Sequence, residues 1–452
     1  MGLRGRGRLG LGPHRGYLAR APGARACARC GRETDDVGRT SLTPGEHLAE
    51  IRRSRRLSQT DLARALDVTR TLVSAWENDH RRPRGDHLTA LTEALGDDGT
   101  LVRRFTDPDR GMRTRLFDDP TTVTVLVQRT VDRLIGFLPS ERTRDGQSVY
   151  GWRYDMDDAG APPLALSTAY GLKAVLIAGA RDWRVSLPRI RATLRDLELE
   201  EGGWTVGTLP AVEPVMALPE VSAVIVSALH DAGESDDYVA ERAALVIDAL
   251  RRDVQGTVPA RPYVLATSLF ELSRLPVDVT AARGLIDDLV DLSLDDGGHH
   301  TWPVRVRGPS LAPITPSPVH TAIVVCALAA WARRLDDARI SEIALSGAAW
   351  LERSQDLSLE DETLWRQGDD GLTATPVPVR EFTPAWIVRA LLATGRHAGS
   401  APVTRALHEM FRYHLADVDL WHWPRGGGLV PVWMTYNAVA ALVAWAGAHE
   451  IG

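Results

Sequence analysis

The chain has 452 residues, which is long for one domain and predicts two or three folded units. Its hydrophobic content of 44% and charged content of 25% are ordinary for a globular protein. No apolar run approaches the ~18 residues of a membrane span and there is no signal-peptide pattern, so we expect a cytoplasmic protein without membrane contact. The three cysteines (Cys27, Cys30 and Cys326) exclude a disulfide framework.

The charge is unevenly distributed along the chain. Residues 1–40 carry nine arginines against three acids, a net +6, and residues 41–96 carry nine against eight, a net +1. The total is −6, so the remainder carries −13. A basic N-terminal part followed by an acidic remainder indicates that the N-terminal part contacts nucleic acid.

Residues 1–40 are rich in Gly and Arg and have no periodicity, which predicts a disordered basic tail. Cys27 and Cys30 form a single CxxC pair in this tail. A structural zinc site needs four ligands and no second pair is nearby, so we expect no metal and no other cofactor.

Residues 41–96 are predicted to form four short helices. Ser58 caps "QTDLARAL", with Asp61 as its capping-box partner, Thr69 caps "RTLVSAWE", and Asp86 caps "HLTALTEAL". Only a short turn separates the second and third helices, which is helix-turn-helix geometry.

The stretches "LSQTDLARALDV", "TRTLVSAWEN" and "RRP" closely resemble the Cro/repressor-like (XRE) helix-turn-helix family. The resemblance covers residues 41–96 and implies double-stranded DNA as the partner, bound by a homodimer. It also implies that Glu77 pairs inside the domain with an arginine of the first helix, here Arg52.

The same resemblance assigns residues to the DNA interface by position. It places Gln59 against a phosphate, and it places the start and exposed face of the third helix at base edges. Asn78 and the two arginines that follow it would hold the DNA backbone. The assigned residues are Gln59, Thr69, Arg70, Thr71, Ser74, Asn78, Arg81 and Arg82.

Residues 97–120 are charged and contain prolines, which predicts a linker, and an internal repeat follows in residues 121–452. Each unit has an aromatic or Gly-rich loop, an apolar helix begun by Ser or Thr, and a polar-faced helix. The expected helix-start residues are Thr168, Ser222, Thr267, Thr321, Thr383 and Thr435. Six such helix pairs predict an all-α protein in which a helix-turn-helix domain is joined to a closed (α/α)6 ring.

The Gly-Gly-Trp loop at residues 202–204, together with Trp152, Trp302, Trp365 and Trp421, resembles the repeat signature of the terpene cyclase and prenyltransferase toroids. That family includes cyclases that protonate an alkene with an Asp-x-Asp-Asp motif. The chain has this spelling at Asp155, Asp157 and Asp158, but the stretch "AGAPP" follows the motif and the next helix is expected to start about ten residues later. A solvated carboxylic acid stays ionised near neutral pH, so we assign no catalytic residue.

The zinc ligands of the prenyltransferases are not matched either, because Cys326 lies inside an apolar helix without the expected acid beside it. Three tryptophans adjoin inner-helix starts and are candidates to line a central cavity, namely Trp386, Trp423 and Trp433.

The favoured function is a sequence-specific transcriptional regulator whose ring senses a small-molecule ligand or binds a protein partner. One alternative is a terpene-cyclase-like or glycan-acting enzyme that carries a DNA-binding module. Another is an interaction scaffold in a defence or conflict system.

Overall fold

The computed structural model describes residues 44–78, 83, 85–96, 120–138, 142–144, 147–180, 185–206, 217–255, 261–304, 314–367, 374–415, 418–424 and 429–451. The chain divides into two compact units, Met1–Thr106 and Asp107–Gly452. Helices dominate both units, and the predicted all-α class, a helix-turn-helix domain plus an (α/α)6 toroid, is confirmed.

The first unit contains α1 (Pro44–Ser54), α2 (Gln59–Ala65), α3 (Arg70–Glu77) and α4 (Gly85–Leu95). Leu48, Leu62, Trp76 and Leu91 are buried at its centre, where apolar side chains from all four helices meet. The third helix has the predicted limits, whereas α4 begins one residue before Asp86. Asp86 therefore lies in the first turn of α4 instead of preceding it.

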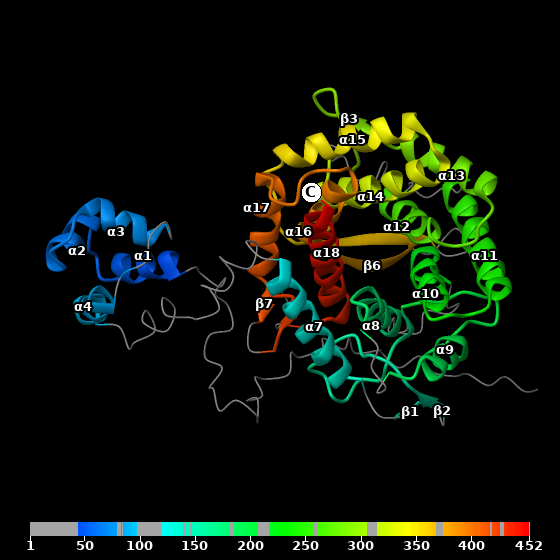
Figure 1. Ribbon diagram of the computed structural model, residues 1–452, viewed down its shortest axis with the longest axis horizontal. Coiled ribbons are helices and arrows are strands. Elements are labelled where there is room, and N and C mark those ends of the chain that lie inside the picture. Colours follow the sequence, from blue (N-terminus) through cyan, green and yellow to red (C-terminus); the bar gives the residue numbers. More distant parts are fainter. Residues whose placement is uncertain are drawn as a thin grey trace, which may run out of the picture. The chain divides into compact units, whose positions relative to one another are not determined.

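In its described residues, the second unit is a ring of six inner helices surrounded by six outer ones (Figure 1). Each inner helix packs on the next, and the last packs on the first, which closes the ring. The inner helices are α8 (Ala165–Ile177), α10 (Pro219–Asp231), α12 (Pro262–Leu272), α14 (Pro318–Leu335), α16 (Thr383–Ala393) and α18 (Val432–Ile451). The outer helices are α7 (Pro120–Gly136), α9 (Leu187–Asp196), α11 (Asp236–Gln255), α13 (Val279–Asp291), α15 (Ala338–Arg353) and α17 (Ala401–Phe411).

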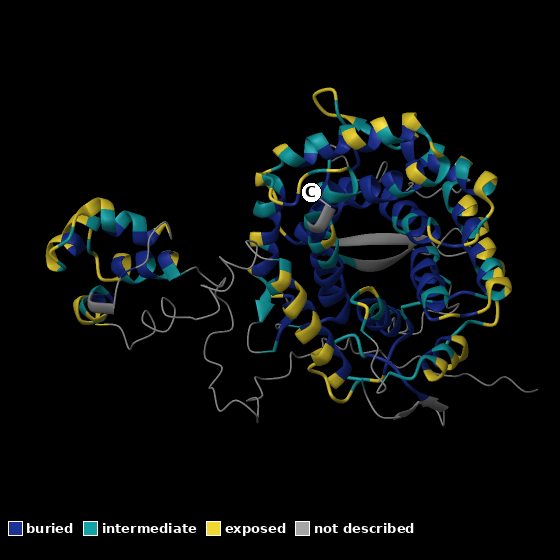
Figure 2. Cartoon of the chain, viewed as in Figure 1, coloured by how far each residue is buried: buried dark blue, intermediate teal, exposed yellow. Residues whose placement is uncertain are grey.

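Burial follows the two layers of the ring. The inner helices are buried nearly all round, whereas each outer helix exposes one face (Figure 2). This matches their sequences, because a helix that is apolar on every side must lie inside and an amphipathic one covers it. None of the helices within the described residues is long and apolar enough to cross a membrane.

Five of the six expected helix-start residues lie in the first turn of their inner helix, whereas Thr267 lies in the middle of α12. In four units a tryptophan joins this turn to the preceding outer helix. The backbone N–H of Trp302 donates to Thr321 Oγ1 of α14 at 3.0 Å, and its indole N–H donates to the Leu289 carbonyl of α13 at 2.8 Å. Trp152, Trp204 and Trp421 repeat both bonds in their own units. These tryptophans hold the two layers of the ring together.

A hairpin of β5 (Glu360–Gln367) and β6 (Ala374–Glu381) connects α15 to α16 and crosses the middle of the ring in the view of Figure 1. At its base, Glu360 accepts a hydrogen bond from Ser317 at 2.9 Å, just before α14, and Arg380 donates to Tyr154 at 3.4 Å, before α8. The base of the hairpin therefore lies at the end of the ring where the inner helices begin.

The described loops of the second unit contain three smaller antiparallel hairpins. They are β1 (Arg142–Arg144) with β2 (Gln147–Val149), β3 (Leu294–Asp295) with β4 (His300–Thr301), and β7 (His414–Leu415) with β8 (Leu420–Trp421).

Candidate nucleic-acid interface and ring pocket

Two side-chain caps fix the start of α2 and the start of α3. Ser58 Oγ accepts the Asp61 backbone N–H at 3.1 Å, and the Asp61 carboxylate accepts the Ser58 backbone N–H at 3.1 Å, which is the predicted capping box. The Ser58 hydroxyl also donates to the Asp61 carboxylate at 2.6 Å, and this bond together with the one from the Ser58 backbone N–H lowers the pKa of Asp61. At the start of α3, Thr69 Oγ1 accepts the Leu72 backbone N–H at 3.2 Å. The two helices are thus held at a defined turn by local polar contacts.

The third helix has a buried face and an exposed face. Val73, Trp76 and Glu77 are buried, whereas Arg70 and Thr71 are exposed. Ser74 is half-buried, and its carbonyl accepts the side-chain amide N–H of Asn78 at 2.8 Å, a bond that closes the end of the helix. The exposed face carries a long guanidinium and a hydroxyl, which are side chains suited to reading base edges in a major groove.

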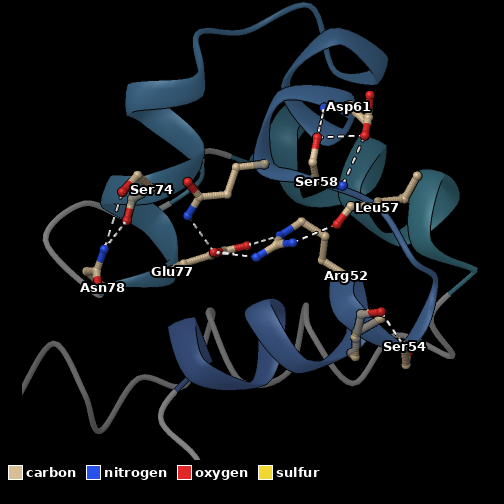
Figure 3. A network of polar contacts seen from close by, with 10 residues as sticks. Arg52, Ser54, Leu57, Ser58, Asp61, Ser74, Glu77 and Asn78 are labelled. Carbon is tan, nitrogen blue, oxygen red and sulfur yellow. Dashed lines mark hydrogen bonds and ion pairs between the residues drawn. The ribbon is translucent and has the colours of Figure 1, made fainter.

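A buried polar network ties α1 to α3 (Figure 3). Arg52 Nε lies 2.5 Å from Glu77 Oε1 and Arg52 Nη2 lies 3.0 Å from Oε2, which confirms the predicted internal pair. Gln59 Nε2 donates to Glu77 Oε2 at 2.8 Å, and Arg52 Nη1 donates to the Leu57 carbonyl at 2.6 Å. The amide nitrogen of Gln59 thus contributes to this network, and its expected phosphate contact stays a prediction.

Several predicted features lie outside the described residues. They are Arg81 and Arg82, the basic tail of residues 1–40 with its Cys27 and Cys30, and residues 97–119 of the expected linker. The remaining interface residues of the sequence prediction, from Gln59 to Asn78, lie on one continuous segment made of α2, the turn and α3.

The Asp-x-Asp-Asp stretch forms a loop in which two of the carboxylates accept hydrogen bonds from backbone N–H groups. Asp157 and Asp158 are exposed. Asp155 Oδ1 accepts the backbone N–H groups of Asp157 at 3.2 Å and Val430 at 3.0 Å, and Asp158 Oδ1 accepts the backbone N–H of Gly160 at 2.9 Å. This arrangement supports a structural role, since an acid that protonates an alkene has to be shielded and protonated.

The three candidate cavity tryptophans are all buried. The rings of Trp423 and Trp433 lie 5.8 Å apart, between centroids. The guanidinium of Arg389 lies 4.1 Å from the ring centroid of Trp386 and 4.9 Å from that of Phe270. Aromatic faces that could stabilise a carbocation therefore already contact a cation of the protein itself, which disfavours cyclase chemistry at this point.

A buried ion pair that sequence reasoning missed lies inside the ring. Lys173 of α8 donates from Nζ to Glu271 of α12 at 2.7 Å and to Ser227 of α10 at 2.7 Å. Burial opposes the charge of Lys173, but the nearby Glu271 and Asp231 outweigh it, so the pKa of Lys173 is raised. The signal in the sequence was that Lys173 is the only lysine of the chain and sits in an apolar helix.

The geometry defines a helix-turn-helix domain with an outward-facing third helix, joined in one chain to a closed ring of helix pairs. Comparison with known families supports the helix-turn-helix assignment, because residues 48–96 match the helix-turn-helix family model. Residues 48–96 are therefore a helix-turn-helix domain. No curated protein matches the chain.

Solved structures resemble the chain only distantly. A glycoside hydrolase family 76 mannosidase of Bacteroides thetaiotaomicron has a TM-score of 0.48 and 10% identity, and the match covers 73% of this chain and 99% of that one. An α-1,6-mannanase of Salegentibacter sp. has a TM-score of 0.48 and 14% identity, covering 72% and 99%. PlcR of Bacillus thuringiensis, in complex with the peptide PapR7 and DNA, has a TM-score of 0.23 and 14% identity, covering 69% and 96%. At these values the likenesses carry no inference about activity, substrate or partner.

Proposed function

We propose that the protein is a sequence-specific DNA-binding transcriptional regulator. The observation that carries this proposal is the third helix, whose exposed Arg70 and Thr71 project from a helix that is capped at Thr69 and anchored by the Arg52–Glu77 pair. Such a helix can enter a major groove with its side chains already oriented. The match of residues 48–96 to the helix-turn-helix family supports the same function.

In this proposal the interface has two kinds of contact. Arg70, Thr71 and Ser74 face base edges, while Gln59, Asn78, Arg81 and Arg82 face the DNA backbone. A homodimer would read two half-sites, and the ring would bind a small molecule or a protein partner. A ligand that stabilises one arrangement of the ring more than another would shift the population of the DNA-binding state.

Binding-site selection with the full chain and random duplex DNA tests the proposal. Arg70→Ala should relax the preference at one base position, at a cost of ~1–3 kcal/mol in discrimination, because a bidentate contact to guanine is lost. Arg82→Ala should weaken binding to all sequences alike and reduce the salt slope by about 1, because it removes a phosphate contact.

Arg251→Ala is the matched control, since Arg251 is an exposed arginine of α11 that pairs with Asp248 and belongs to the ring. It should leave both the selected sequence and the affinity unchanged. If Arg70→Ala selects the same sequences as the unaltered protein, the assignment of α3 as the reading helix is wrong.

A further inference from the structure

A pocket of about 240 Å³ opens next to Lys173 in the ring. Ile177 and Asp231 are the last residues of α8 and α10, and Arg274 follows the end of α12, so the pocket lies at the end of the ring where these inner helices finish. The hairpin base lies at the opposite end. The lining residues are Lys173, Leu176, Ile177, Asp231, Arg274 and Tyr436.

Among the described residues, the Lys173 ammonium has two hydrogen-bond acceptors, and Lys173 also lines the pocket. An ammonium group has three protons to donate, and Ser227 and Glu271 accept two of them. The nearest further acceptor given by the structure is Asp231 Oδ2, at 3.7 Å from Nζ, which is beyond hydrogen-bond distance. A ligand acceptor placed in the pocket would complete the coordination of the buried ammonium.

Among the described residues at the pocket, the charges cancel. Lys173 and Arg274 supply two positive charges, and Glu271 and Asp231 supply two negative ones. Arg274 Nη2 donates to Asp231 Oδ1 at 3.2 Å, and about half of the Arg274 side chain is exposed, so its guanidinium has further N–H groups to offer. A ligand with a net charge would leave an uncompensated charge in a partly desolvated site, whereas a ligand with one charge of each sign would not.

We propose that this pocket binds a small aliphatic zwitterion of the α-amino-acid class. Its carboxylate accepts from Lys173 Nζ and the Arg274 guanidinium, its ammonium group donates to Asp231, and its aliphatic side chain packs on Leu176 and Ile177. The proposal deepens the proposed function, on which it rests, by naming the ligand class that the ring senses.

The test uses the full chain without DNA and exploits its single lysine. Isotope labelling of lysine side-chain nitrogen gives one ammonium NMR signal, that of Lys173. Titration with leucine should shift this signal and raise the melting temperature of the ring. Isocaproate, which lacks the amino group, and isopentylamine, which lacks the carboxylate, should each bind at least about tenfold more weakly, which is ~1.4 kcal/mol.

Two variants remove pocket contacts and keep the buried pair of Lys173 and Glu271 intact. Arg274→Ala and Asp231→Asn should each weaken leucine binding at least about tenfold. Arg339→Ala is the matched control, because Arg339 is an equally exposed arginine of α15 that pairs with Asp287. It should leave the titration unchanged.

If isocaproate bound as tightly as leucine, the pocket would be a simple anion site and the proposal of a zwitterion site would be wrong. A lysine signal that no titrant moves would show that Lys173 and Glu271 only stabilise the ring. Because the readout needs no DNA, a chain that binds leucine but selects no DNA sequence would refute the regulator proposal alone, and the converse result would refute the pocket proposal alone.

Discussion

Both units of the chain enclose a buried cation bonded to a glutamate, but the two pairs differ in how completely they are satisfied. In the first unit, Glu77 accepts from Arg52 through both oxygens and also from Gln59. In the ring, Lys173 donates two hydrogen bonds among the described residues, to Glu271 and Ser227, and the residue also lines a pocket. A saturated pair fixes one geometry, whereas an incompletely bonded pair beside a pocket can take up another partner.

The largest expected effect comes from breaking the saturated pair. Glu77→Ala leaves Arg52 buried without its carboxylate, which costs ~3–5 kcal/mol. Because a small domain is only marginally stable, the first unit should lose most of its folded population and the chain should lose DNA binding. Hydrogen exchange of residues 44–96 measures this, with the ring as internal reference.

Arg64→Ala serves as the control for that prediction. It removes the exposed ion pair with Asp61, at 3.5 Å, and should cost at most about 1 kcal/mol. Equal effects of Glu77→Ala and Arg64→Ala would contradict a structural role for the buried pair.

Breaking the pair in the ring should remove a smaller fraction of the free energy of unfolding, because the ring is the larger unit. Lys173→Met leaves Glu271 buried and unpaired and should destabilise the ring by ~3–5 kcal/mol. The double variant Lys173→Met with Glu271→Leu should recover most of this loss, because two apolar groups then replace the pair. Urea unfolding of the ring measures both, and a double variant no more stable than the single one would speak against the pairing.

The smallest effect concerns the tryptophans that join the layers of the ring. Trp302→Phe keeps a large aromatic ring but leaves the Leu289 carbonyl without its donor, at a cost of ~1–3 kcal/mol in the free energy of unfolding. Trp350→Phe is the control, because the Trp350 indole donates to the exposed Asp296 at 2.7 Å and that acid can bind water instead. Equal unfolding free energies for the two variants would show that the bond to Leu289 contributes little.

Local signals explain why the first unit could be predicted nearly residue by residue. Ser58 and Thr69 cap helices through bonds to residues three positions away, so the sequence contains both partners of each bond. The Arg52–Glu77 pair spans 25 residues, and it was predictable only because the resemblance supplied it.

The ring could be predicted as a repeat but not in its details. The hairpin β5–β6 was missed because Pro376 and Pro378 argue against a strand, although a two-stranded sheet has only edges and tolerates them. The pocket was missed for a different reason. Its central bonds join Lys173 to Ser227 and Glu271, 54 and 98 residues away, and no periodicity reports which side chains of neighbouring inner helices meet.

The closure of the ring between α8 and α18 has a mechanical consequence. Helix α18 packs on α8 there, and α7 packs on both. The pocket takes Lys173 from α8 and Tyr436 from α18, so its occupant would sit between the two helices that support α7. Since α7 is the first helix after residues 97–119, a change in the spacing of α8 and α18 would move the helix from which the chain leads back to the helix-turn-helix domain.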